Sequence, residues 1–157
     1  MITTLFRYNA WANAQIVNRS ELVSEAQFNA VTGDRNLHEL LFHAMRTEWV
    51  WRVICQEHKG PAQDLRIQDF PTLSKIKDRW LEDDAHLQSF IAGLSDDDFS
   101  HPVEVQDRQG NLSSETPWQM LMHIILHSMQ HRTEAAALLT DYGQSPGDLD
   151  FIFYVSP

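Results

Sequence analysis

Apolar residues recur every three or four positions in four long stretches of this sequence, and this spacing predicts amphipathic α-helices. The expected helices cover about residues 3–18, 36–57, 72–92 and 117–139, the last ending before a Tyr-Gly stop. Four long helices joined by one tight and two longer connections favour a four-helix bundle. The length suits one domain with a single core, so we expect residues 1–157 to fold as one unit.

Sequence signals for the start of a helix are strongest for the last of the four expected helices. Thr116 and Gln119 have the spacing of a capping box, and Pro117 occupies the first helical position, where its missing amide hydrogen costs nothing. For the second helix, Asp34 or Asn36 is available as the N-cap. Both starts agree with the positions that the periodicity predicts.

The remaining segments are short. Val103 and Val105 alternate with polar residues ahead of a turn-rich stretch at 107–111, which predicts a two-stranded hairpin before the last helix. Residues 24–29 predict a short helical piece, and the three aspartates at 96–98 indicate the solvated end of a connection. The predicted class is therefore all-α with one small hairpin.

The net charge of the chain argues against some classes of binding partner. The chain carries 22 acidic against 12 basic residues, a formal net charge of −10, which on average repels nucleic acid and anionic membrane surfaces. No apolar stretch is long enough to span a membrane and no signal peptide is evident, so we expect a cytoplasmic protein with no nucleic-acid or membrane partner. The single cysteine, Cys55, excludes an intrachain disulfide, and its apolar neighbours predict a buried, inert thiol.

Three histidines lie four residues apart in the last helix: His123, His127 and His131. At 3.6 residues per turn they share one face, where imidazoles at i and i+4 can reach a common metal ion. The competing interpretation is a solvated helix face, because an apolar stripe follows the opposite side of the helix. That stripe consists of Trp118, Met122, Ile125, Met129 and Ala136.

A fourth histidine, His43, lies in the second helix, which is apolar nearly all round. A buried imidazole needs a hydrogen-bond partner or a metal to offset the loss of its hydration. Combined with a pair from the last helix, it supplies the third ligand of a metal site inside a bundle. Three neutral imidazoles leave one coordination position open, as in catalytic rather than structural zinc sites.

Four segments of the chain match, in order, the pattern of one protein family. They are LFRYNAWAN at 5–13, LLFH at 40–43, HIILHSMQHR at 123–132 and GQSPGDLDF at 143–151. With these segments the chain resembles the DinB family of metal-binding four-helix bundles, which is related to the YfiT-like hydrolases and the thiol-dependent S-transferases. The histidine segment of the last helix is the most specific match.

The resemblance implies an up-down-down-up bundle, usually dimeric, with a zinc or nickel type ion held by the residues matching His43, His127 and His131. His123, one turn away, is then a neighbour of the site, a surface residue or a substitute ligand. Glu134 is a candidate acceptor for the ring N–H of a ligand, with a solvated carboxylate as the alternative.

Two classes of function remain. In the first, the protein is a metal-dependent enzyme of the thiol S-transferase or hydrolase type, whose ion lowers the pKa of bound water or of a low-molecular-weight thiol substrate. In the second, it is a non-catalytic metal-binding stress-response module whose ion stabilises the fold or the dimer. For the first class, helix register suggests Arg46, Arg52 or Arg132 as a partner for a substrate carboxylate at the mouth of the site.

Overall fold

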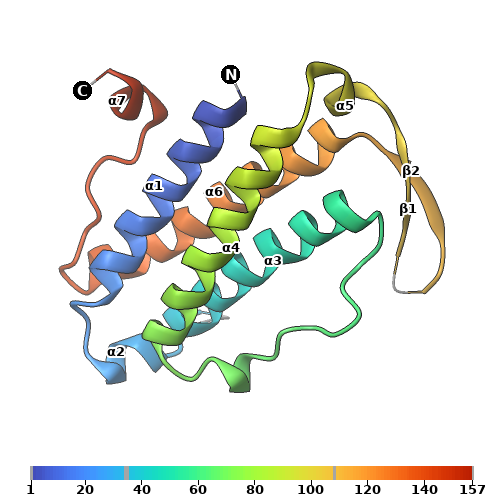
Figure 1. Cartoon of the computed structure of the whole chain (residues 1–157). Helices are drawn as coiled ribbons and strands as arrows, with labels where there is room; N and C mark the ends of the chain where they lie inside the picture. The colour runs from blue at the N-terminus through green and yellow to red at the C-terminus, as the bar shows by residue number, and fades with distance from the viewer. Residues whose placement is uncertain (1, 34–35, 108, 157) are drawn as a thin grey trace.

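Four long helices form most of the computed structural model, which describes residues 2–33, 36–107 and 109–156 (Figure 1). The long helices are α1 (Ile2–Ser20), α3 (Leu37–Glu57), α4 (Leu73–Gly93) and α6 (Pro117–Asp141). The short elements are α2 (Glu25–Asn29), η1 (Ile67–Asp69), α5 (Asp96–Ser100), β1 (Val103–Gln106), β2 (Leu112–Glu115) and α7 (Phe151–Val155). A mostly helical chain with one small hairpin before the last long helix is as predicted.

The predicted helix starts are confirmed by their capping bonds. The Gln119 side chain accepts a hydrogen bond from the Thr116 amide at 2.9 Å, at the start of α6. At the start of α3, Asn36 Oδ1 accepts from the Glu39 amide at 2.8 Å, and Glu39 Oε2 accepts from the Asn36 amide at 3.2 Å. Asp34, the other candidate cap, lies outside the described residues.

The hairpin is a two-stranded antiparallel sheet in which Val103 is opposite Glu115 and Gln106 is opposite Leu112. The turn lies between these strands, as the sequence predicts, and Arg108 within it lies outside the described residues. Gln106 also donates its amide hydrogen to the His58 carbonyl at 3.0 Å, which fastens the hairpin to the end of α3.

The aspartate run at 96–98 has more structure than the sequence predicted. The three aspartates are exposed, as predicted, but they begin the short helix α5 rather than end a connection. Ser95 Oγ accepts from the Asp98 amide at 3.3 Å, and Asp98 Oδ2 accepts from the Ser95 amide at 2.8 Å. The third aspartate is therefore half of a capping box, which a count of consecutive charges does not reveal.

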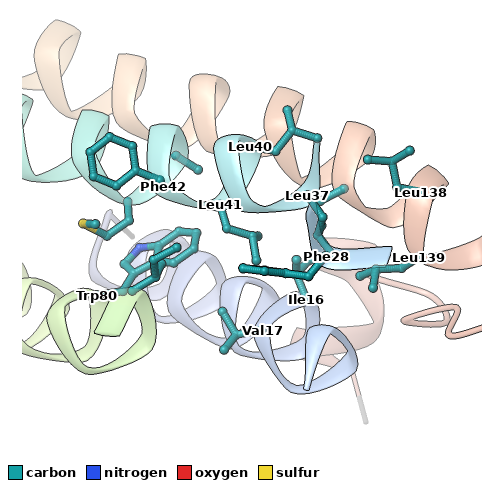
Figure 2. Packing of buried hydrophobic residues seen from close by; sticks show 14 residues of the cluster. Ile16, Val17, Phe28, Leu37, Leu40, Leu41, Phe42, Trp80, Leu138 and Leu139 are labelled. Carbon is teal, nitrogen blue, oxygen red and sulfur yellow. The ribbon is translucent and has the colours of Figure 1, made fainter. Parts of the chain in front are cut away.

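Each long helix packs against two others, because α1 and α3 both contact α4 and α6. α3 and α6 run in opposite directions, since the His43 ring lies against His131 while the Trp51 ring, later in α3, lies against His123, earlier in α6. Figure 2 shows apolar side chains of all four helices pointing toward one another. They include Ile16, Val17, Leu37, Leu41, Trp80, Leu138 and Leu139. None of the described helices is long and apolar enough to cross a membrane.

A buried carboxylate, Glu48, lies among these helices and accepts hydrogen bonds from four side chains. The donors are Asn9 Nδ2 at 3.0 Å, Asn13 Nδ2 at 2.8 Å, Trp80 Nε1 at 2.8 Å and Ser128 Oγ at 2.5 Å. Arg132 is also buried and donates to the amide oxygens of the same two asparagines at 2.5 and 2.8 Å. Desolvation lowers the Arg132 pKa, while the charge of Glu48 acts in the opposite direction. This polar network joins α1, α3, α4 and α6.

The face of α6 that enters the core differs from the predicted apolar stripe. Trp118 and Met129 are each 49% exposed, and of that stripe Ile125 is buried. The buried residues of α6 are instead Pro117, Met120, Leu121, Ile124, Ile125, Ser128, His131, Arg132, Ala135, Leu138 and Leu139. The prediction failed because α6 carries two apolar stripes, and periodicity alone does not show which one faces the neighbouring helices.

The segment after α6 packs on the outside of α1. Tyr8 donates its hydroxyl hydrogen to the Leu149 carbonyl at 2.8 Å. The Tyr8 ring lies 5.3 Å from that of Phe151, and the Trp11 and Tyr154 rings are 5.4 Å apart. Edge-to-face and tilted ring contacts of this kind fix α7 against α1.

Arg132→Ala should lower the free energy of unfolding by about 3–5 kcal/mol, because it leaves the Glu48 charge buried without its compensating cation. Urea denaturation of wild type and variant measures the difference. The matched control is Arg66→Ala, which removes an arginine from an exposed ion pair with Asp69 and should change stability by less than about 0.5 kcal/mol. Equal small effects in both variants would contradict the role given to the network.

Candidate metal centre

His43, His127 and His131 converge between α3 and α6. One ring nitrogen of each lies within 4.8 Å of those of the other two. The i, i+4 spacing places His127 and His131 on adjacent turns, with their Nε2 atoms 3.2 Å apart. The antiparallel packing of α3 brings His43 to them, with ring centroids at 5.0 and 4.6 Å. The structure therefore joins the three histidines that the sequence selected.

Glu134 accepts a hydrogen bond from Nδ1 of His131 at 2.8 Å. This contact decides between the two interpretations of Glu134 in favour of an acceptor for a histidine N–H, although the side chain remains 42% exposed. A carboxylate on Nδ1 holds the proton there and leaves Nε2 as the atom with a free lone pair. The lone pair of His131 is thus directed toward His127.

The donor set fits a divalent transition metal. Tetrahedral ligands at the usual zinc–nitrogen distance of about 2.0–2.1 Å lie about 3.3 Å apart, which agrees with the 3.2 Å between the Nε2 atoms of His127 and His131. Imidazole nitrogens suit zinc, nickel, copper and iron, whereas calcium and magnesium prefer oxygen ligands. Three histidines with a carboxylate behind one of them are typical of a metal site.

His123 lies one turn before His127 and outside the converging set. Its ring lies 4.6 Å from the Trp51 ring and 5.5 Å from the His127 ring, measured between centroids. Burial of part of the ring lowers the pKa of His123, which favours the neutral form. His123 is exposed and packs on Trp51, so it is a neighbour of the histidine cluster at the protein surface.

A hollow of about 460 Å³ adjoins the other end of the centre. It is lined by Thr32, Leu40, Gln130, His131, Glu134, Ala137 and Leu138. His131 and Glu134 belong both to this hollow and to the centre. A small molecule in the hollow would therefore contact the edge of the histidine cluster directly.

The three arginines suggested for the mouth of the site all pair with other residues of the protein, so none of them is available to a substrate carboxylate. Arg132 is buried in the Glu48 network. Arg52 pairs with Asp83 at 3.1 Å, and Arg46 forms a two-pronged ion pair with Asp64. Helix register identified these arginines as candidates but did not predict their partners, because each partner comes from another part of the chain.

The sulfur of Cys55 takes no part in the centre. Its side chain is buried in a second apolar cluster with Phe6 and Leu121, and desolvation raises its pKa to about 12. A thiol with this pKa holds its proton at neutral pH and is a poor nucleophile. The prediction of a buried, inert cysteine is confirmed.

The packing of the long helices and the histidine cluster define a helical protein with a candidate metal centre. The sequence model of the DinB family matches residues 1–157, so the chain belongs to the DinB family. The chain is also similar to the protein named Protein DinB from Bacillus subtilis (strain 168). The two are 22% identical over 159 residues, which cover 96% of this chain and 91% of that protein.

The Cys55 thiol should resist an aromatic disulfide reagent in the folded protein at about pH 8, because burial keeps it protonated and inaccessible. Labelling should be at least about 100-fold faster in denaturant, since the thiol pKa then returns to its ordinary value of about 8.5. The absorbance of the released thiolate follows both rates. Rapid stoichiometric labelling of the folded chain would contradict the burial.

Proposed function

We propose that this protein binds one divalent transition metal ion, zinc or nickel, through His43, His127 and His131, and acts as a metal-dependent enzyme of the thiol S-transferase or hydrolase type. The observation that supports the proposal most is the convergence of three imidazole nitrogens within 4.8 Å. Family membership supports it independently. The contacts among the four long helices support the up-down-down-up bundle on which the centre would be built.

When bound, the ion would lower the pKa of a thiol or water at its open position and so supply a nucleophile at neutral pH. The protein's own groups perform the remaining tasks. Glu134 keeps the His131 proton on Nδ1, and the Trp51 ring packs against His123, one turn before His127. The hollow beside His131 is the place for the body of a small substrate.

The proposal includes a cytoplasmic homodimer. Three large apolar side chains on the outer face of α6 support a partner surface: Trp118, Leu126 and Met129 are 49%, 53% and 49% exposed. Leu126 lies about two turns after Trp118 and Met129 follows three residues later, so the three side chains share one side of α6. Apolar stripes of this kind on a folded domain are typical of protein interfaces.

Elemental analysis should find about one metal ion per chain in the wild type, because three histidines complete one site. Single alanine variants of His43, His127 and His131 should each lose most of the ion. His123→Ala is the matched control, since it removes an imidazole from the same helix face but outside the converging set. Undiminished metal in the three variants, or a loss in the control as large as theirs, would refute the ligand set.

Glu134→Gln should weaken metal binding by about 10–100-fold, because a neutral amide supports the His131 N–H less well than a carboxylate does. Competition with a chromophoric chelator measures the affinity. Glu82→Gln removes the same charge from an exposed position on α4 and should leave the affinity unchanged. An unchanged affinity in Glu134→Gln would show that the 2.8 Å contact has no influence on the centre.

Turnover distinguishes an enzyme from a module that only binds metal. Metal-loaded protein should transfer low-molecular-weight thiols to electrophilic acceptors, and the alanine variants of the three histidines should be folded but inactive. Cys55→Ser should keep nearly the full rate, because the nucleophile would not be a protein thiol. Circular dichroism verifies folding beside each rate. Full activity in metal-free protein would refute the mechanism, and metal binding without any turnover would favour the non-catalytic stress-response module.

A further inference from the structure

A groove between α1 and α4 is separate from the candidate centre, which lies between α3 and α6. The two helices run antiparallel, since Glu21, just after α1, pairs with Lys77 near the start of α4 at 2.6 Å (Figure 1). The groove has a volume of about 160 Å³. Its apolar walls come from Ala10, Ala14, Val17, Trp80 and Leu81. The two alanines leave the space open because their methyl groups are too small to fill it.

Asp84 adds a carboxylate to these apolar walls, one turn after Trp80. Gln88 Nε2 donates to it at a long distance of 3.4 Å. Over residues 2–33, 36–107 and 109–156, no lysine, arginine or histidine nitrogen lies within 4.0 Å of this carboxylate. Lys77 also lines the groove, but it is seven residues away, about 10 Å along the helix, and is paired with Glu21.

Asp84 differs in this respect from Glu48 and Asp83, the two acids that are buried among the described residues. Glu48 has four donors, and Asp83 is bonded by two arginines at 3.1 and 2.7 Å. Desolvation, opposed by the hydrogen bond from Gln88 and aided by the charge of Glu48, raises the pKa of Asp84 to about 6. Above that pH the folded protein carries a partly buried charge without a counter-ion, which costs stability. Ionisable groups that lie in a hollow despite such a loss of stability are characteristic of binding sites.

We propose that the groove between α1 and α4 binds a small organic cation, a primary amine with a short apolar chain or ring. Its ammonium group pairs with the Asp84 carboxylate, and its apolar part lies against Ala10, Ala14 and Leu81. The pairing is charge-assisted and partly shielded from water, so it is stronger than a hydrogen bond between neutral groups. The small volume restricts the apolar part to a short chain or a single ring. The net charge of −10 also attracts cations to the protein.

Three probes with the same chain and different charge test this proposal: n-hexylammonium, n-hexanol and hexanoate. NMR shifts of the Ala10 and Ala14 methyl groups report binding to the wild type at about pH 7.5 and low ionic strength. Hexylammonium, protonated like a lysine at this pH, should bind about tenfold or more tightly than hexanol, and hexanoate should not bind. Equal binding of the three probes, or no binding of hexylammonium, would overturn the proposal.

Asp84→Asn should reduce the affinity for hexylammonium to that for hexanol and leave hexanol binding unchanged. Glu82→Gln is the matched control, because it removes one negative charge from an exposed position of α4 outside the groove. Its affinity for hexylammonium should equal that of the wild type. An equal loss in both variants would assign the effect to net charge and overturn the proposal.

The melting temperature of Asp84→Asn tests the carboxylate without any ligand. Because the folded-state pKa is raised to about 6 from the ordinary 3.8, the wild type loses stability as pH rises through this window. The variant should therefore melt above the wild type at about pH 7.5, and the difference should shrink at about pH 4. The other charged groups near the groove, Glu48 and Lys77, are the same in both proteins. An equal melting temperature at both pH values would show that the carboxylate is well solvated and would overturn the proposal.

Light scattering on the same samples distinguishes a free groove from one covered by a second copy of the chain. Ala14→Arg places a large charged side chain in the groove and should abolish hexylammonium binding without changing the oligomeric state. If this variant dissociates an oligomer, and hexylammonium fails to bind the wild type, the groove belongs to self-association and the proposal is wrong.

Discussion

The hydrogen-bond network around Glu48 is the constraint on which the rest of the fold depends. An ionised carboxylate in an apolar interior is unfavourable unless donors surround it, and here the donors come from α1, α4 and α6 while Glu48 itself belongs to α3. Arg132 supplies the opposite charge through the two asparagines. Because each bond needs a defined distance, the network fixes how the four helices are rotated against one another.

This rotation also decides where the histidines lie. Ser128 and Arg132 belong to the network, and each directly follows a histidine of the candidate centre. His43 precedes Glu48 by five residues on α3. The hydrogen bonds among these polar groups fix the rotation of α3 and α6. This rotation places the three imidazoles together between the two helices. The apolar core alone would tolerate small rotations, whereas the network does not.

The acidic side chains of this protein have different surroundings and different roles. Glu48 and Asp83 are surrounded by donors and join helices. Glu134 is half exposed and orients one imidazole. Asp84 lies in an apolar groove with one weak hydrogen-bond donor, and its pKa is correspondingly raised. Burial, number of donors and nearby charge thus separate structural carboxylates from those available to a ligand.

Local signals in the sequence determined the helices, their caps and the short hairpin, because capping boxes and apolar periodicity act between residues close in the chain. The i, i+4 spacing also placed the histidines of α6 on one face, and the apolar surroundings of His43 made it a candidate third ligand. The family resemblance then selected His127 and His131 as its partners. Only the tertiary structure decided which apolar stripe of α6 enters the core, as the exposure of Trp118 shows. It also decided that the three suggested arginines pair with other residues and that Asp84 has no cation partner among the described residues. These features depend on side chains brought together from distant parts of the chain, and local periodicity contains no information about such contacts.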